Sequence, residues 1–483
     1  MSTLFRAGSS VYKALLGAQV LIFAFLSFAF IGSAQAQSSP DWVLEETFDG
    51  DPPAPSQALL PRNFDYVATH RQHPQEQFTR VYPAFPADHG EDCAGPNPNV
   101  SPLPQHAVVT RQDSDGGNPD ESFFICKNHM MSAMGEVAWY SNSAFWPRQE
   151  FDFSDGGVLE FDVSLNLGHG QRVWWEVLIA PREQMRAGTA SPESAIDERY
   201  PADRIVLNFS ELVRHIRVGS GTIDPEGWQV NERQFGPYDW SYWNALHPED
   251  PALTDRRIRR TMRISLDHDQ IIWAIEMADG NFDEYSVPLP EGLPFTRGLV
   301  MFKTHAYTPN GHGNFDTFTF HWDNIRFDGP SVGHYAAYPA DDVVYLQANG
   351  NRPIGDSKTV SITLPEIGPN PVLFGQLHGS LRGQVRLSIN GLPEVEVVPY
   401  EYALDNCVSG EWRDWKSFRL ALDPAWLQPG ENTLTWHVGP RPDCASKPDW
   451  WNGYSAKFLQ IQMDLPDRVG TMFADGFESL GVN

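Results

Sequence analysis

The sequence predicts an all-β protein, with two consecutive antiparallel β-sandwich (jelly-roll) domains after a signal peptide. Short segments in which apolar and polar residues alternate recur along the chain, with turn residues between them, as expected for strands that are buried on one side. The chain contains 39 Gly, 39 Pro and 12% aromatic residues, a composition typical of strands joined by many turns. Its 483 residues exceed what one hydrophobic core usually organises, which favours two domains over one.

The N-terminus has the order of a secretory signal. Arg6 and Lys13 precede the apolar run from Ala14 to Ile31, and the small-residue cleavage site Ala34-Gln35-Ala36 follows. We therefore expect residues 1–36 to be removed and the mature protein to be secreted or periplasmic. An uncleaved anchor is the alternative, because an apolar run of this length can span a bilayer.

Four cysteines fit an oxidising destination. Three pairings are possible on paper, and pairing Cys93 with Cys126 and Cys407 with Cys444 keeps each disulfide within one domain. We expect these two disulfides. A metal site would need closer spacing, such as Cys-x-x-Cys.

The first domain is expected over residues 41–330. A strand begins at Trp42, and the Pro-, Asn-, Asp- and Gly-rich stretch from about Gly50 to Glu121 is interpreted as long loops. No helical periodicity separates the strands that follow, which favours a sandwich or jelly roll. These strands are expected at Val158–Leu165, Val173–Ile179, Arg204–Phe209, Thr261–Leu266, Ile271–Met277, Leu299–Tyr307 and Phe318–Phe327.

A turn-rich stretch with Gly-Pro and Tyr-Pro follows the first domain. We place a linker there at residues 331–342, a second sandwich at 343–466 and a C-terminal tail at 467–483. The dipeptide Asn390-Gly391 predicts a hairpin turn within the second sandwich. Its strands are expected around Val360–Leu364, Val385–Ile389, Leu434–Val438 and Leu459–Met463.

Several short segments resemble known families. The opening Leu44–Gly50, the strand Val158–Val163 and the closing Phe320–Phe327 resemble the concanavalin A-like lectin/glucanase jelly roll over about residues 41–330. Ser388-Ile389-Asn390-Gly391 and Leu427–Leu434 are similar to segments of galactose-binding-like β-sandwiches. The tail Met472–Glu478 is similar to tails of exported proteins from Gram-negative proteobacteria. These resemblances imply an exported protein that binds carbohydrate.

The glucanase motif of this fold is incomplete in the sequence. Laminarinase-type enzymes carry Glu-x-Asp-x-x-Glu on one strand, which brings a nucleophile and an acid/base close together. Here Glu160-x-Asp162 is followed by Val-Ser-Leu, and Glu394-x-Glu396 also lacks the third carboxylate. Strand alternation predicts that these pairs point outward. The sequence also lacks the Gly-x-Ser-x-Gly motif of serine hydrolases and the His-Glu-x-x-His motif of zinc enzymes. It has no phosphate-binding loop and no dinucleotide-binding fingerprint.

One face of the predicted sheet, which we expect to be half exposed, carries polar and aromatic residues. Strand parity places on it Trp174, Glu176, Asn208, Lys303, His305 and Tyr307, opposite the core-directed Trp175, Val177, Phe302 and Thr304. We expect Trp174, Asn208 and Lys303 to bind a glycan, because sugars stack on aromatic rings and bond to polar groups. Glu176, His305 and Tyr307 are the candidates for proton transfer. The structural alternative is a solvated face on which Lys303 pairs with Glu176.

His129 is a further ligand-binding candidate, because it lies near the expected disulfide at Cys126 and ahead of Trp139-Tyr140. A buried, hydrogen-bonded structural histidine is the alternative. Aromatic residues of the second domain, around Trp450 and Trp451, offer another place for a sugar.

Calcium is the metal that the resemblance implies. Jelly rolls of this class often join their first and last strands through a hard cation, and Glu46, Asp49 and Asp323 occupy those ends here. A second acidic candidate, Asp113-Ser114-Asp115-Gly116-Gly117, does not follow the EF-hand spacing.

The net charge of the chain limits the classes of molecule that it can bind. The formal net charge is −27, with 35 Lys and Arg against 62 Asp and Glu, which argues against nucleic acid. The sequence therefore predicts an exported protein that recognises a polysaccharide or glycan. A polysaccharide lyase or glycoside hydrolase using the same face is the first alternative, and a structural or adhesive surface protein is the second.

Overall fold

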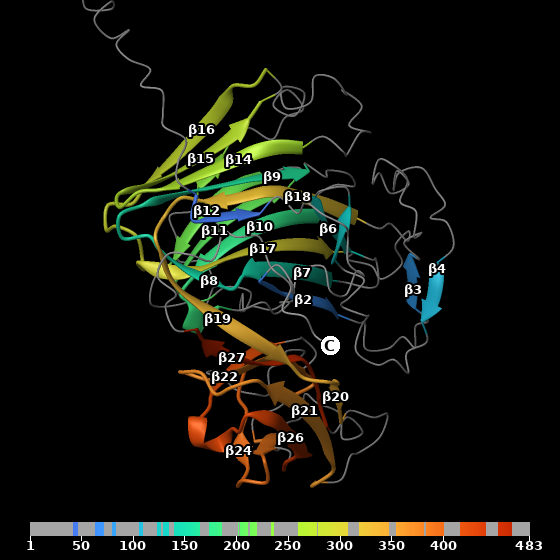
Figure 1. Ribbon diagram of the computed structural model, residues 1–483. Coiled ribbons are helices and arrows are strands. Elements are labelled where there is room, and N and C mark those ends of the chain that lie inside the picture. The colour runs from blue at the N-terminus through green and yellow to red at the C-terminus, as the bar shows by residue number, and fades with distance from the viewer. Residues whose placement is uncertain are drawn as a thin grey trace, which may run out of the picture. The chain divides into compact units, whose positions relative to one another are not determined.

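Strands dominate the computed structural model of this chain, and all their pairings are antiparallel (Figure 1). The described residues contain two short 3-10 turns, Arg182–Gln184 and Pro424–Trp426, and no α-helix. The all-β fold class predicted from the sequence is therefore confirmed. The structure describes residues 42–46, 63–71, 80–83, 106–109, 123–126, 129–134, 140–164, 173–185, 201, 203–210, 213–219, 233–235, 259–277, 279–307, 318–346, 354–380, 383–399, 416–440 and 453–465.

Eight strands form a sheet that we call the outer sheet. Seven of them pair in the order β16 (Phe282–Pro288), β15 (Gln270–Glu276), β14 (Arg259–Leu266), β9 (Gly157–Ser164), β18 (Phe318–Phe327), β6 (His129–Met134) and β5 (Phe123–Cys126). The first strand, β1 (Leu44–Glu46), pairs with β18. We call the strands within residues 41–330 the first series and the strands within residues 343–466 the second series. The first and the last strand of the first series, β1 and β18, therefore lie side by side.

Thirteen strands form a second sheet, which we call the shared sheet because it runs through both series of strands. Its order is β13 (Arg233–Phe235), β12 (Val213–Gly219), β11 (Arg204–Ser210), β10 (Val173–Ala180), β17 (Arg297–Tyr307), β8 (Gln149–Asp152), β19 (Ser331–Pro339), β27 (Ser455–Asp464), β22 (Val372–His378) and β25 (Lys416–Ala421). Off this path, β7 (Tyr140–Pro147) joins β17 to β2 (Phe64–Arg71), and β20 (Val344–Tyr345) pairs with β27.

Four strands form the terminal sheet, in the order β21 (Ser357–Leu364), β26 (Gly430–Val438), β23 (Val385–Ile389) and β24 (Val395–Glu396). A separate pair joins β3 (Arg80–Pro83) to β4 (His106–Val109). Strands β2, β3 and β4 lie in the stretch from 50 to 121 that the sequence analysis assigns to loops. That assignment is wrong for them, because short runs of aromatic and β-branched residues between the turn residues suffice for pairing.

The main core lies between the outer sheet and the shared sheet. Phe161 of β9 meets Trp175 of β10 edge to face at 5.8 Å between ring centroids, and Trp322 of β18 meets Phe302 of β17 at 5.5 Å. All four side chains are buried, as is Thr304. Alternation along each strand places these residues inward, as the sequence predicts.

A second core fills the space between the terminal sheet and the C-terminal part of the shared sheet. Val360, Ile362 and Leu364 of β21 are buried in it with Leu434 and Trp436 of β26. The predicted hairpin turn is confirmed: Asn390 and Gly391 have φ of 50° and 74°, and Leu392 N–H donates to the Ile389 carbonyl at 2.9 Å. Positive φ at both central residues matches the right-handed twist of the flanking strands.

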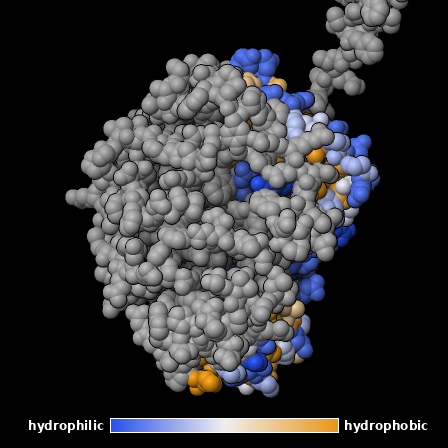
Figure 2. Space-filling view, turned by 180° about the vertical axis from the view of Figure 1, so that it is seen from behind, coloured by the Kyte–Doolittle hydropathy of each residue, from blue (hydrophilic) through white to orange (hydrophobic). Residues whose placement is uncertain are grey.

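The described surface exposes few large hydrophobic side chains, and in the view from behind most of the coloured surface is hydrophilic (Figure 2). Those exposed by more than a third are Val343, Tyr345, Ile354, Leu392, Val398 and Leu465. All six belong to the second series of strands. Among the described residues, no large hydrophobic side chain of the first series is exposed to this extent.

Strand β19 occupies most of the stretch that the sequence analysis assigns to a linker. It pairs with β8 through Ser331, Gly333 and His334, and with β27 through Tyr335–Pro339. The Gly-Pro and Tyr-Pro dipeptides lie at the ends of the strand, where proline does not interrupt the pairing. Residues 42–483 form one compact unit. The division into two domains therefore stays a prediction.

Several sequence predictions fall outside the described residues. These are the signal peptide over 1–36, the tail over 467–483, and Cys93, Cys407 and Cys444. Cys126 ends β5, but its side chain is not described. Within the described part of the chain, no helix is long and apolar enough to cross a bilayer.

Candidate functional site

Strands β11, β10 and β17 bring part of the predicted face together. In the register of the shared sheet, Glu176 of β10 lies opposite Asn208 of β11 on one side and Lys303 of β17 on the other. We call Asn208, Glu176 and Lys303 the polar row. The next position along the strands places Trp174 opposite His305. Strand parity therefore predicted the arrangement of these backbone positions correctly.

The polar row is joined by direct contacts. Asn208 Nδ2 donates a hydrogen bond to Glu176 Oε1 at 2.9 Å, and Lys303 Nζ lies 4.0 Å from Glu176 Oε2. The side chains of Glu176 and Lys303 are both 0% exposed, whereas Asn208 is half-buried. The expectation that this face is half exposed is therefore wrong for Glu176 and Lys303. Parity decides which face a side chain occupies, but it does not decide what covers that face.

Burial gives the polar row a strong electrostatic character. Charged side chains are rarely buried unless they are paired, and a low local dielectric strengthens the attraction between them. The row presents an acceptor, an ammonium donor and an amide that can do both. Such a set can hold hydroxyl groups, and a carboxylate beside an ammonium can also take part in proton transfer.

The row continues further than the sequence analysis expected. His215 of β12 lies opposite Asn208, and Gln234 of β13 lies opposite His215. Both positions were missed because Val213–Gly219 and Arg233–Phe235 were not identified as strands. The available signal was the alternation of the apolar Ile216 and Val218 with the polar His215 and Arg217.

The other predicted site residues are placed less completely. Tyr307 lies opposite Tyr140 of β7, but the side chains of Trp174, His305 and Tyr307 lie outside the described part of the structure. His129 lies opposite Cys126 in the outer sheet, not among the strands of the polar row. Its role as a ligand-binding residue stays a prediction.

The apolar side chains next to the polar row are also covered. Leu178 of β10 lies opposite Val206 of β11 and Met301 of β17, one row along from Glu176. All three are buried in a cluster that also contains Tyr335 of β19 and Phe374 of β22. We call this cluster the bridging cluster. It lies beside the polar row, on the face of the shared sheet opposite the main core.

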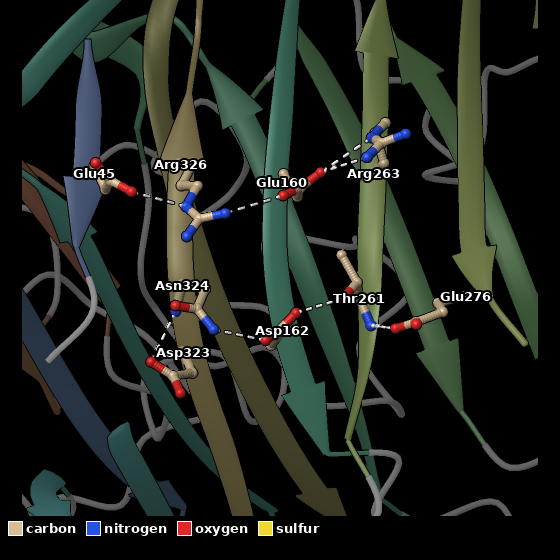
Figure 3. A network of polar contacts seen from close by, with 9 residues as sticks. All are labelled: Glu45, Glu160, Asp162, Thr261, Arg263, Glu276, Asp323, Asn324 and Arg326. Atoms are coloured by element: carbon tan, nitrogen blue, oxygen red, sulfur yellow. Dashed lines mark hydrogen bonds and ion pairs between the residues drawn. The ribbon is translucent and has the colours of Figure 1, made fainter. Parts of the chain in front are cut away.

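Glu160 and Asp162 lie on β9 of the outer sheet, not on the strands of the polar row. Figure 3 shows their polar contacts. Glu160 accepts hydrogen bonds from Arg263 Nε and Nη2 at 3.0 and 2.8 Å, and Arg326 Nη1 lies 3.5 Å from it. Asp162 accepts from Thr261 Oγ1 and Asn324 Nδ2, both at 2.7 Å. Both carboxylates point away from the core, as alternation predicts. They stabilise the face of the outer sheet through cross-strand pairs.

The calcium prediction falls at the junction of β1 and β18. Glu46 lies opposite Ile325, and Asp323 accepts a hydrogen bond from the Asn324 N–H at 2.9 Å. Asn324 has a φ of 48°, at an irregularity between Asp323 and Arg326. Asp49 and the acidic stretch 113–117 lie outside the described residues. Within the described part, no group of three His, Cys, Asp or Glu residues could hold a metal ion.

Carboxylate oxygens at adjoining strands suit calcium, so the site remains a proposal with a direct test. Calcium is expected to raise the melting temperature, because a ligand bound only by the folded state stabilises it by about 2.7 kcal/mol when its concentration is about 100 times Kd. Asp323→Ala should abolish this rise. Asp279→Ala, in an exposed turn, should keep it. Equal melting of the parent protein in calcium and in chelator would rule the site out.

No protein-family model and no curated protein matches the sequence. Solved structures similar to this chain include lectin I-B4 from Griffonia simplicifolia, with 14% identity over 43% of this chain and 89% of the lectin, at a TM-score of 0.30. The laminarinase from Rhodothermus marinus has 14% identity over 61% of this chain and 100% of its own, at a TM-score of 0.32. The β-glucanase from Bacillus licheniformis has 10% identity, covers 44% and 83% of the two chains, and has a TM-score of 0.28. These are the classes of protein that the sequence resemblance names, and the similarity is one of fold only.

Proposed function

We propose that this protein is exported and binds a carbohydrate on the face of the shared sheet that carries the polar row. The observation that supports this proposal is the contact of a carboxylate, an ammonium and an amide across three neighbouring strands, on the face opposite the main core. Sugar hydroxyls both donate and accept hydrogen bonds, and the side-chain amide of the half-buried Asn208 can do both.

The burial of the polar row determines which of its side chains a sugar would contact. Asn208 is the half-buried member, and its amide is oriented by the bond to Glu176. The buried Glu176 and Lys303 then act from beneath, through the field of their charges. The backbone position of Trp174, one row along, offers an aromatic ring as a platform for the C–H face of a sugar.

The second candidate function is a polysaccharide lyase or glycoside hydrolase at the same place. The separation of 4.0 Å between Lys303 Nζ and Glu176 Oε2 favours it, because titratable groups held together in a buried setting are suited to proton transfer. His305 lies opposite Trp174 in the register, close to this pair along the strand. Product release from a panel of polysaccharides would distinguish the enzyme from the binding protein.

Affinity electrophoresis in gels that contain those polysaccharides, followed by a glycan array, tests binding. Asn208→Ala and Trp174→Ala are each expected to weaken binding by roughly tenfold or more, since about 1.4 kcal/mol corresponds to a factor of ten. Trp42→Ala is the matched control, because Trp42 is half-buried beside Arg326 of the outer sheet. Its affinity should equal that of the parent protein. Failure of the parent protein to bind any glycan would leave the structural or adhesive alternative.

A further inference from the structure

A buried carboxylate lies where the two series of strands meet. Asp65 of β2 is 1% exposed. Arg148, which follows β7, donates from Nε to Asp65 Oδ1 at 2.8 Å, and Tyr335 of β19 donates from its hydroxyl to Oδ2 at 2.8 Å. Tyr335 in turn accepts a bond from Trp146 Nε1 at 2.8 Å. Asp65 therefore anchors β19 to the N-terminal strands.

The second series of strands supplies two further donors. Gln460 Nε2 and Gln462 Nε2 of β27 lie 3.1 and 3.4 Å from Asp65 Oδ2. We call Asp65, Arg148, Tyr335, Gln460 and Gln462 the coupling cluster. Burial and the neighbouring Asp65 raise the pKa of Tyr335 well above its usual value, so its hydroxyl stays a donor. Asp65 thus accepts hydrogen bonds from residues up to 397 positions away in the chain.

Apolar and ionic contacts surround this cluster. Trp146 of β7 meets Phe374 of β22 edge to face, with ring centroids 6.0 Å apart, inside the bridging cluster. Arg182, just after β10, pairs with Asp464 of β27 at 2.5 Å and lies over the Tyr335 ring at 4.3 Å. The C-terminal half of β27 therefore contacts β2, β19 and Arg182, which follows β10.

These contacts differ from those of a loosely attached module. Interfaces between independent domains are usually polar and permit relative motion, whereas removal of one partner from a buried, hydrogen-bonded charge is strongly destabilising. Here a shared strand, β19, and a buried charge connect the two series. The apolar row next to the polar row belongs to the same buried cluster as Tyr335 of β19 and Phe374 of β22.

We propose that the second sandwich is not a separable binding module but a structural part of the first. The two sandwiches unfold as one cooperative unit, and Asp65 is the residue that couples them. This proposal is independent of carbohydrate binding. It concerns the cooperativity of unfolding, which can be measured on the full chain without any ligand.

Scanning calorimetry of the full chain is the test. The parent protein is expected to show one transition with equal calorimetric and van't Hoff enthalpies, the mark of a single cooperative unit. Asp65→Ala should split the transition in two or make the calorimetric and van't Hoff enthalpies unequal, with the first melting about 5 °C lower. Simple destabilisation would lower the melting temperature without changing the enthalpy ratio.

Asp342→Ala is the matched control, because it removes an exposed carboxylate that pairs with Lys358 at 2.6 Å within the second sandwich. This variant should leave both the melting temperature and the ratio of calorimetric to van't Hoff enthalpy nearly unchanged. If Asp65→Ala fails to fold, the double variant Gln460→Leu, Gln462→Leu removes two donors while Arg148 keeps its bond to Asp65, and the same change in ratio is expected. Two transitions in the parent protein, or an unchanged ratio in the variants, would overturn the proposal.

Discussion

Trp175→Ala is expected to lower the free energy of unfolding by about 3–5 kcal/mol, the usual cost of truncating a buried aromatic side chain. Trp175 is 1% exposed and stacks on Phe209 at 5.3 Å between ring centroids. It also meets Phe161 and Trp322 of the opposite sheet, both at 5.8 Å. Its indole N–H has no hydrogen-bond partner among the described residues. The loss therefore comes from packing and from the cavity that remains.

Urea unfolding followed by far-ultraviolet circular dichroism measures this loss, as a lower midpoint at an unchanged slope. Trp42→Ala serves again as the control, since a half-buried ring loses less contact, and we expect it to cost about 1 kcal/mol or less. Equal costs for the two variants would contradict the inward orientation of Trp175.

Glu176→Ala is expected to cost about 3–5 kcal/mol, because it removes the carboxylate from beside a buried ammonium. The side chains of Glu176 and Lys303 are both 0% exposed, and Asn208 donates to Glu176. Glu176→Gln should cost less, because it keeps an oxygen that can accept from Asn208. The same unfolding measurement applies, and a neutral effect of Glu176→Ala would show that the pair is unimportant for stability.

The double variant Glu176→Leu, Lys303→Met separates stability from function. Apolar residues of similar volume often replace a buried ion pair at little or no cost, so we expect much of the stability to return. If the polar row binds carbohydrate, the refolded double variant should lose binding in affinity electrophoresis. A stable double variant with full binding would assign the pair to packing alone.

Local alternation predicted most of the first sandwich correctly. The strands expected at Val173–Ile179 and Phe318–Phe327 match β10 and β18 to within one residue, because side-chain direction alternates with a period of two in any strand. The same rule placed Glu176, Asn208 and Lys303 on one face. It could not predict their burial, because burial depends on segments that are distant in sequence.

The sequence by itself determined the fold class, the inward residues such as Trp175 and Phe302, and the parity of the polar row, all of which follow from backbone geometry within single strands. Tertiary structure alone decided that residues 331–339 form β19, that Asp65 meets Gln460 and Gln462, and that Glu176 and Lys303 are enclosed. The physical reason is that pairing partners and coverage depend on contacts between residues far apart in the chain. Alternation along a strand carries no information about them.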